Sequence, residues 1–414
     1  MRSTPKKVAV VLCSGPNGLG AVRSLKRAGV QAIAVVEDAS DPVLLSRHPI
    51  GKLVANSTGD ADAALLRVLS SIRHERAVLL PTSDAFVSFM VRHRAALRSR
   101  FDFCLPEDLL TLALLDKAQE TALVANLHIP VPKTVQDLPA HGSSLLESLG
   151  IPLIVKPRSF ACRQHLGAKN RVIRSAEELQ RFLHEHRDVL WAFLAQEMIP
   201  GDDDHQWVCH AVFGRTHQLA SVFTFRRLGL APAHRGVTSH AVSEWNPHIV
   251  SLVAHIGREL RYTGAAMVEF KLDPRDRQYK YLELNPRLGM CNYFDTACQV
   301  NTAYEAYCLA AASNSGLRPD RRQRNGVRYL ALFEDLYARS KDGETAVMAV
   351  GRCIATAFQP HVGAYFAWDD FMPGVVVGWR NASRVARGQW NRLLRVIAGE
   401  KVVNPGCDTD HPSR

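Results

Sequence analysis

Apolar runs alternate with amphipathic stretches along the first hundred residues of the chain. The runs VAVVLCSG and QAIAVVED are apolar, and AVRSLKRAGV between them carries its apolar residues at helical spacing. A second cycle follows, in which ALLRVLSSIR predicts a helix and AVLLPTSD predicts a buried strand. This alternation of strand and helix predicts a parallel, doubly wound sheet at the start of the chain.

Glycines mark the first strand-to-helix turn. Gly15, Gly18 and Gly20 stand where a dinucleotide pyrophosphate would meet a helix N-terminus, and in that interpretation Glu37 would be the ribose partner. The spacing is G-x-x-G-x-G and not G-x-G-x-x-G, so a tight strand-to-helix turn is the favoured interpretation.

The hydrophobic pattern changes near Leu115. LLDKAQETALVANLHIPVPKT predicts a helix that ends before an extended entry to a new segment, because Pro130 and Pro132 cannot continue a helix. IPLIVKPRS then predicts a short strand, AEELQRFLHEHRD a helix, and WAFLAQEMIPGDDD a strand that runs into an acidic turn. WVCHAVFG and HQLASVFTFRR, with a turn that contains glycine between them, predict an antiparallel hairpin.

The stretch AMVEFKLDPRDRQYKYLELNPRLG predicts a second hairpin, because Asp, Pro and Arg residues suited to a turn separate two apolar strands. A turn centred near Asp276 places Glu269 opposite Glu283, and Asn285 lies on the same face since side chains repeat every second residue. Facing carboxylates repel unless a proton or a cation lies between them. The hairpin therefore predicts a site for Mg²⁺ or Mn²⁺, with an exposed face of solvated acids as the alternative.

Composition and charge narrow the class of protein. The 414 residues predict two to four domains at about 100 to 200 residues each, and 47% hydrophobic with 22% charged residues is typical of a soluble globular chain. A net charge of +11 favours an anionic partner such as a phosphorylated ligand. The basic residues are scattered and no Lys/Arg run is interleaved with aromatics, so no nucleic-acid partner is expected.

The cysteines and the lengths of the apolar runs indicate in which cellular compartment the protein is expected. The nine cysteines form no C-x-x-C pair and no grouping with histidines, which predicts free thiols in a reducing cytoplasm and no structural zinc. The basic start and short apolar run in MRSTPKKVAVVLCSG are interpreted as a first strand and not a signal peptide. No stretch approaches the roughly 20 apolar residues of a membrane helix, so no membrane partner is expected.

Two lysines lie beside apolar segments: Lys117 follows Asp116, and Lys156 closes IVKP. A phosphate would balance a cation that is costly to bury there. Together with QEMIPGDDD, VEFKLD and LELNPR, in that order, these lysines resemble the nucleotide and metal elements of the ATP-grasp superfamily over about residues 116 to 312. VLLPTSDAFV, QEMIPGDDDHQW, TFRRLGLAPAHRGVTS and EFKLDPRD are similar to segments of its carboxylate–amine ligases of the D-aspartate ligase type.

This resemblance implies an α/β fold in several parts. Residues 1–115 are expected to form a doubly wound parallel pre-ATP-grasp domain. Residues 116–315 are expected to form a two-lobed ATP-grasp domain with antiparallel sheets, with the small lobe at about 116–200 and the large lobe at about 201–315. Residues 316–414 are expected to complete the sheet, cover the active site or form a homodimer contact, with a disordered tail at 404–414.

The resemblance also implies roles for individual residues. Lys117 and Lys156 would contact the ATP phosphates, and Glu269, Glu283 and Asn285 would bind one or two magnesium ions. The adenine hinge would be Glu197, Met198 and Ile199, with Asp204 on the ribose. Arg287 and Arg226 would neutralise the transferred phosphoryl group or the substrate carboxylate, and the candidate substrate-binding residues are Arg227, Arg235 and His240.

One segment departs from the family pattern. RSFACRQHLGAKNR, after Lys156, contains a single glycine, Gly167, where many ATP-grasp enzymes fold a glycine-rich loop over the γ-phosphate. Lys169 and Arg163 are the donors that this segment offers instead.

The activity implied is ATP-dependent ligation of a carboxylate to an amine, with small-molecule substrates such as an amino acid or a small peptide. A substrate carboxylate would attack the γ-phosphorus of ATP, and an amine, deprotonated with help from His240 or Glu244, would then displace phosphate from the acyl phosphate. Two alternatives stay open. One is an ATP-grasp enzyme that uses its acyl phosphate or carboxyphosphate with another acceptor, and the other is a non-catalytic nucleotide-binding module.

Overall fold

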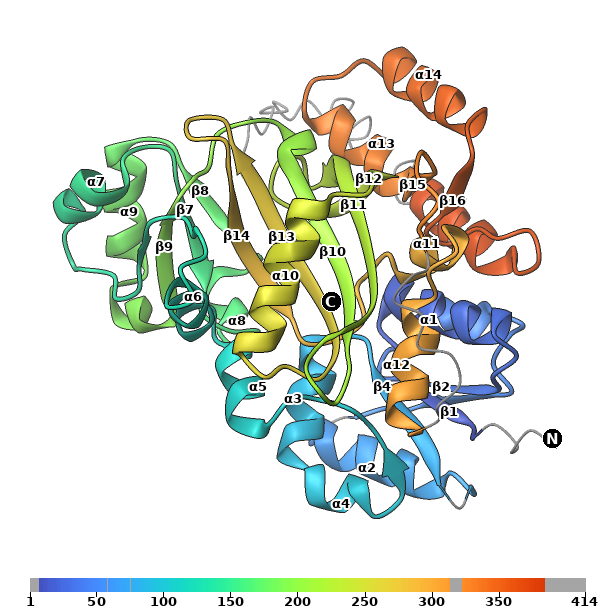
Figure 1. The fold of residues 1–414 in the computed structure, drawn as a ribbon. Helices are drawn as coiled ribbons and strands as arrows, with labels where there is room; N and C mark the ends of the chain where they lie inside the picture. The colour runs from blue at the N-terminus through green and yellow to red at the C-terminus, as the bar shows by residue number, and fades with distance from the viewer. Residues whose placement is uncertain (1–6, 58, 75, 313–321, 384–414) are drawn as a thin grey trace, which may run out of the picture.

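Three β-sheets organise the chain in the computed structural model, which describes residues 7–57, 59–74, 76–312 and 322–383 (Figure 1). The first sheet lies in the N-terminal part, the second in a small lobe at the left of the view, and the third runs through the centre. The predicted tail at 404–414 lies outside the described residues.

The first sheet is parallel throughout and has the strand order β3-β2-β1-β4-β5. Its strands are β1 (Ala9–Leu12), β2 (Ala32–Val36), β3 (Gly51–Val54), β4 (Ala77–Pro81) and β5 (Phe101–Asp102). The helices of this part are α1 (Gly15–Arg27), η1 (Pro42–Leu45), α2 (Ala61–Ser71), α3 (Asp84–Arg92), α4 (Arg94–Arg98) and α5 (Asp108–Leu115). This confirms the doubly wound parallel sheet that the apolar pattern predicts.

Both faces of this sheet are buried, which explains why its strands are apolar without interruption. In β1, Ala9 and Val11 pack with α1, whereas Val10 and Leu12 pack with α2 and α3. The α1 face is shared with α12 (Thr302–Ala310), which comes from much later in the chain. The N-terminal part therefore depends on a distant helix for its core.

The glycines of the first turn serve packing. A Cβ at Gly18 would lie 2.4 Å from the Cβ of Cys13, and one at Gly20 would lie 2.8 Å from the side chain of Asn292. The Asn17 side-chain amide donates to the carbonyls of Thr82 and Leu288. Residues near 290 thus fill the N-terminal turns of α1 where a dinucleotide pyrophosphate would approach, which supports the tight-turn interpretation.

The second sheet is antiparallel, with the order β6-β9-β7-β8. Its strands are β6 (Thr134–Val135), β7 (Leu153–Pro157), β8 (Arg171–Ile173) and β9 (Phe193–Glu197). The accompanying helices are α6 (Lys117–Ala125), α7 (Ser143–Leu149), α8 (Arg163–Leu166), α9 (Ala176–Glu185) and η2 (Arg187–Ala192). Leu145 of α7 and Leu179 and Phe182 of α9 form one core with the strands.

The third sheet has the order β14-β13-β10-β11-β12-β15-β16. Its strands are β10 (Gln206–Phe213), β11 (Leu219–Ala231), β12 (Val237–Ser243), β13 (Gly264–Asp273), β14 (Gln278–Asn285), β15 (Arg328–Leu330) and β16 (His361–Gly363). The associated helices are η3 (Asp203–His205), α10 (Pro247–Glu259), α11 (Asn292–Ala297), α13 (Leu332–Lys341) and α14 (Ala346–Ala357). The two predicted antiparallel hairpins, β10–β11 and β13–β14, are confirmed.

The C-terminal region adds β15 and β16 to this sheet beside β12. The pair β15–β16 is parallel, whereas the strand pairs within residues 116–315, where antiparallel sheets are predicted, are antiparallel. The reason is the connection, because α13 and α14 lie between the two strands and bring the chain back to run in the same direction.

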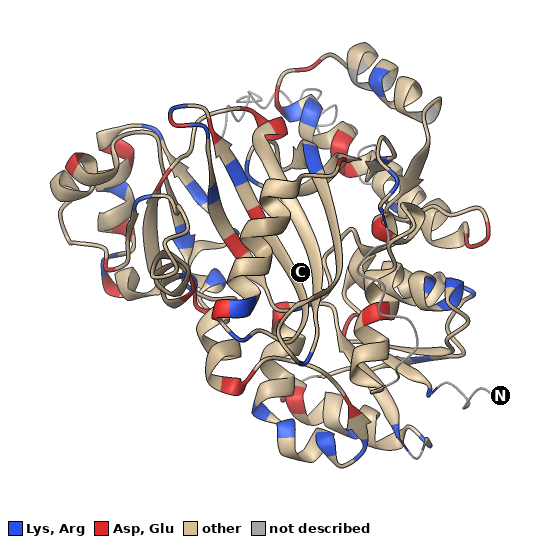
Figure 2. Cartoon of the chain, in the orientation of Figure 1, with Lys and Arg blue, Asp and Glu red and all other residues tan. Residues whose placement is uncertain are grey.

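One face of the third sheet packs on α10, through Ile249, Val253 and Ile256. Lys and Arg positions and Asp and Glu positions both occur in all three parts of the described chain (Figure 2). Among the described helices none is long and apolar enough to cross a bilayer.

Candidate active site at the junction of the three parts

The β13–β14 hairpin brings the predicted carboxylates together. Glu269 pairs with Glu283 and Met267 with Asn285 across the two strands, so Glu269, Glu283 and Asn285 share one face. The opposite face is apolar, with Val268 and Leu284 in the core under α10. The alternation of the sequence therefore separates a polar face from a packed one, as predicted.

Lysines from the small lobe converge on Glu283. The Lys117 Nζ, at the start of α6, donates to the Glu283 Oε1 at 2.7 Å, and the Lys169 Nζ lies 3.7 Å from Oε2. Lys156, at the end of β7, donates to the side-chain oxygen of Gln196 at 2.7 Å and adds its charge to the same field. Three cations thus surround one carboxylate, and the described site holds an excess of positive charge.

The neighbouring charges shift the pKa values of Lys156 and Glu283. Burial, and then repulsion from Lys117, lower the pKa of Lys156 to about 8. Burial opposes ionisation of Glu283, but Lys117 and Lys169 hold the pKa of its carboxyl well below its usual range. An anion placed among these lysines would relieve their mutual repulsion, which fits a polyphosphate ligand.

Glu269 is already paired. Both of its oxygens accept from the Arg227 guanidinium, at 2.7 and 2.8 Å, and the pair is almost completely buried. Gln206 accepts a further bond from the same guanidinium. This bidentate pair fixes the Arg227 side chain across three strands of the sheet.

The side-chain oxygens of the hairpin are candidate ligands for a metal ion. Carboxylate and amide oxygens are the donors that Mg²⁺ prefers, and Glu283 and Asn285 present such oxygens beside the lysines. No group of three or more His, Cys, Asp or Glu suited to a metal occurs in the described part of the chain. The residues therefore fit an ion shared with a ligand's phosphates better than an ion held by protein alone.

Arg287 links the hairpin to the N-terminal part. Its Nε donates to Asp84 at 2.7 Å, at the start of α3, and its Nη2 donates to the side-chain oxygen of Asn285 at 2.9 Å. The guanidinium thus lies next to the candidate metal donors, while Asp84 fixes its orientation.

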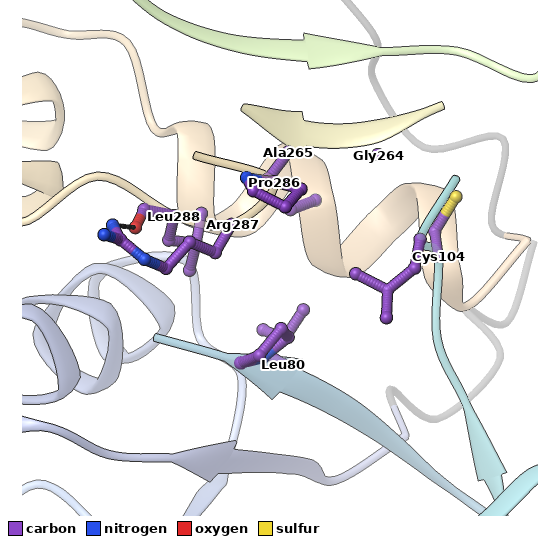
Figure 3. A pocket seen from close by; sticks show the side chains of 10 residues that line it. Leu80, Cys104, Gly264, Ala265, Pro286, Arg287 and Leu288 are labelled. Atoms are coloured by element: carbon purple, nitrogen blue, oxygen red, sulfur yellow. Dashed lines mark hydrogen bonds between the residues drawn. The ribbon is translucent and has the colours of Figure 1, made fainter. Parts of the chain in front are cut away.

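A cavity of about 430 Å³ opens beside this cluster. Its wall includes Lys117, Glu283 and Asn285, and continues over the N-terminal ends of α2 and α3 and over the segment after β7. The volume is in the range of small-molecule sites. A second pocket between Leu80, Cys104 and Gly264 (Figure 3) measures about 10 Å³, room for one water at most.

Comparisons with known proteins bear on the fold of the chain and on its similarity to ligases. No family model matches the chain. Over 316 residues, 72% of this chain and 75% of the relative, the sequence is 23% identical to the D-aspartate ligase of Enterococcus faecium (strain Aus0004). The biotin carboxylase–β,γ-ATP complex from Campylobacter jejuni matches with a TM-score of 0.60 at 14% identity, covering 78% of this chain and 74% of that one. An L-amino acid ligase from Bacillus licheniformis matches with a TM-score of 0.54 at 14% identity, covering 77% and 78%.

The chain has the ATP-grasp fold that these structures share. The similarity to carboxylate–amine ligases of the D-aspartate ligase type, predicted from the sequence, is confirmed, and so is the α/β fold with a parallel first sheet and antiparallel second and third sheets apart from the β15–β16 pair.

The predicted adenine hinge lies at the end of β9. Glu197 is the last residue of the strand, and its carboxylate accepts from the Lys133 backbone N–H and from Arg275. Since that side chain is engaged, the predicted adenine contact would have to use backbone groups of Glu197, Met198 and Ile199.

Arg226 and Asp204 lie together, apart from the lysines that surround Glu283. Arg226 donates to Glu244 at 3.0 Å and lies 3.6 Å from Asp204. Arg226 precedes Arg227 in β11, so alternation turns it to the opposite face of the sheet. Arg227, and not Arg226, therefore contacts Glu269 of the hairpin.

Arg235 and His240 are also outside the cluster. Arg235 is exposed in the β11–β12 loop, where its carbonyl accepts from Asn170 of the small lobe. Burial lowers the pKa of His240 to about 4, and its Nε2 has no hydrogen-bond partner in the described structure. The charges nearest to it belong to Asp335 and Arg328, and not to the site.

Sequence reasoning missed three supporting residues. Glu120 accepts from the Tyr281 hydroxyl and from the Leu284 N–H, and burial raises the pKa of its carboxyl to about 8. Gln196 fixes Lys156, and Asp84 fixes Arg287. Glu120 lies three residues after Lys117, on the same side of α6, and that spacing was the available signal.

Proposed function

We propose that this chain is an ATP-dependent ligase that joins a small-molecule carboxylate to an amine through an acyl phosphate. One observation carries the proposal: Lys117, Lys156 and Lys169 surround Glu283, and Lys117 and Glu283 line a cavity large enough for a substrate. Similarity to a D-aspartate ligase supports the reaction class.

In this proposal the lysines hold the polyphosphate of ATP. Lys117 and Lys156 contact the phosphates, Lys169 closes from the segment after β7, and the Glu197–Ile199 backbone receives the adenine, with Asp204 near the ribose. A magnesium ion bound by Glu283 and Asn285, with Glu269 as the remaining predicted donor, would supply further charge neutralisation on the phosphates.

The chemical steps need no protein nucleophile. A carboxylate oxygen of the first substrate attacks the γ-phosphorus, the bond to the β-phosphate oxygen breaks, and ADP leaves. The amine nitrogen of the second substrate then attacks the acyl carbon, loses a proton, and phosphate departs as the amide forms. Arg287, beside Asn285, is placed to neutralise the transferred phosphoryl group. Arg226 is paired with Glu244 on the opposite face, so the proposal relies on Arg287 for this charge.

The test is to incubate the protein with ATP, Mg²⁺ and a pool of amino acids and dipeptides, following ADP and new masses. ADP together with a product one water lighter than two pool members is expected. ADP release that does not depend on any amine would favour another acceptor, and ATP binding without ADP in any pool would favour a nucleotide-binding module. We place this reaction in the cytoplasm, in keeping with the free thiols of described cysteines such as Cys13, Cys209 and Cys291.

A further inference from the structure

The cavity beside Glu283 lies at the carboxyl edge of the parallel sheet, the edge where α/β proteins bind ligands. Glu37 follows β2, Asp62 lies in the first turn of α2, and Asp84 begins α3. The opposite wall comes from the segment after β7, with Phe160 and Arg163. A ligand here would contact the N-terminal part and the small lobe together.

Most of the charged side chains on the cavity wall are satisfied. Asp62 accepts two hydrogen bonds at 2.9 Å from Arg92. Glu283 is held by Lys117, and Asp84 by Arg287. These pairs use their charge internally and offer little to a ligand.

Two charged side chains of opposite sign differ from the rest. Within the described residues, neither the Glu37 carboxylate nor the Arg163 guanidinium has a hydrogen bond or an ion pair, although Arg163 stacks on the Phe160 ring at 5.1 Å. Glu37 is exposed to solvent, and partial desolvation at the cavity wall, and then the charge of Asp62, raise the pKa of its carboxyl. A cation placed between Glu37 and Asp62 would relieve that repulsion.

The two groups stand on different walls. Arg163 belongs to the segment that also brings Lys169 to within 3.7 Å of Glu283, so it is on the side where phosphate chemistry would occur. Glu37 belongs to the N-terminal part, near Asp62. The same cavity wall also includes apolar residues: Leu65, Phe86, Phe89, Leu114 and Leu115.

We propose that this cavity binds the carboxylate substrate of the ligase, and that this substrate is an amino acid with an apolar side chain. Arg163 binds its carboxylate next to the phosphate cluster, Glu37 binds its ammonium, and the apolar wall receives its side chain. This assignment rests on the proposed function, because it names the carboxylate that is activated there.

The test separates the carboxylate from the amine substrate by replacing the amine with hydroxylamine. Hydroxylamine traps an acyl phosphate as a hydroxamate with loss of phosphate, so the assay reports on the first substrate alone. The probes are leucine and phenylalanine, in both enantiomers, and 4-methylpentanoate and 3-phenylpropanoate, which lack only the ammonium.

Wild-type protein is expected to form hydroxamate with kcat/KM about 10- to 100-fold higher for an amino acid than for its analogue without nitrogen, as loss of one charged hydrogen bond implies. Glu37→Gln should remove this preference and leave the analogue unchanged. Arg163→Gln should weaken both compounds by a similar factor, because both carry the carboxylate. Asp38→Asn, which changes the exposed neighbour of Glu37 outside the cavity wall, should match wild type.

Two results would overturn the assignment while leaving the proposed function in place. One is equal hydroxamate formation from amino acids and analogues by wild-type protein, and the other is an unchanged preference in Glu37→Gln. If no carboxylate yields hydroxamate or ADP, the proposed function fails. Calorimetric titration with the same amino acids then tests, independently of the reaction, whether the cavity binds them. Absence of binding, or binding that Glu37→Gln does not change, would reject the amino-acid assignment of the cavity.

Discussion

At the scale of single residues, the lowered pKa of Lys156 gives ATP binding a pH dependence. Burial and Lys117 lower the pKa of this amine to about 8, so at pH 9 only about one tenth of free protein carries the charge. Because the phosphates bind the protonated amine in the proposed function, KM for ATP is expected to rise about 10-fold between pH 7 and pH 9. Initial rates across this range measure it. Lys156→Arg, which stays charged, should abolish the pH dependence, and an unchanged slope in that variant would assign it to another group.

The two facing glutamates should respond differently to the loss of charge. Glu283→Gln removes the carboxylate that meets Lys117 and the candidate metal, so turnover should fall at least 100-fold, and Tm should also fall because Lys117 and Lys169 lose their counter-charge. Glu269→Gln leaves the buried Arg227 without its counter-charge and should lower the free energy of unfolding by about 3 to 5 kcal/mol. ADP release and urea unfolding of both variants separate the roles. If Glu269→Gln is as stable as wild type but inactive, the main role of Glu269 is to bind the metal and not to pair with Arg227.

At the scale of elements, the segment between β7 and β8 replaces a glycine-rich loop with side chains. It folds into the short helix α8, brings Lys169 to Glu283 and lets Asn170 donate to the Arg235 carbonyl in the β11–β12 loop. Lys169→Ala should therefore raise KM for ATP about 3- to 10-fold, as expected for a partly exposed charge. Arg174→Ala, an exposed change in the same lobe, is the matched control. Equal effects of the two variants would exclude a role for the segment over the phosphates.

The same scale shows which features the sequence could predict. Period-two alternation puts Glu283 and Asn285 on one face of β14, but the register set at the turn reaches the pairing of Glu269 with Glu283 only through an irregularity between Glu269 and Phe270. In β11, two adjacent arginines face opposite sides, and nothing local says that Arg227 points to the carboxylates while Arg226 points to Glu244. That choice depends on the register with β10 and β12 and on two irregularities of β11, after Arg227 and after Gly229. The partners Asp84 and Gln196 come from other parts of the chain and carry no local signal.

At the scale of the whole molecule, the three parts are joined by contacts between residues far apart in sequence. α12 completes the core of the parallel sheet, and Arg287 joins the hairpin to Asp84 of α3. Because the cavity wall draws on the N-terminal part, the small lobe and the hairpin, its shape depends on these contacts. The activity should therefore be sensitive to changes that loosen the parts from one another, even far from the phosphates.

The ion pair between Arg23 and Asp370 is the sharpest case. Arg23 Nε donates to Asp370 at 2.9 Å, the Ser46 hydroxyl and the Arg47 N–H donate to the same carboxylate, and both side chains are 1% exposed. Asp370→Asn leaves the buried Arg23 without its counter-charge, so the free energy of unfolding at pH 7 should fall by about 3 to 5 kcal/mol. Urea unfolding measures the loss. Asp369→Asn, at an exposed neighbour paired with Arg27, should cost less than about 1 kcal/mol.

Acid should erase the difference between wild type and Asp370→Asn. Burial opposes ionisation of Asp370, but the donors from Arg47, Ser46 and Arg23 lower the pKa of its carboxyl below the ordinary aspartate value. For an acid with a lowered folded-state pKa, the stabilisation is complete above the unfolded-state value near 4 and is lost as the pH falls through the folded-state value. The difference in unfolding free energy between the two proteins should therefore begin to narrow below about pH 4 and disappear below the folded-state pKa of Asp370. A constant gap down to pH 2 would show that the loss comes from altered packing, and not from the charge that ties the C-terminal region to α1.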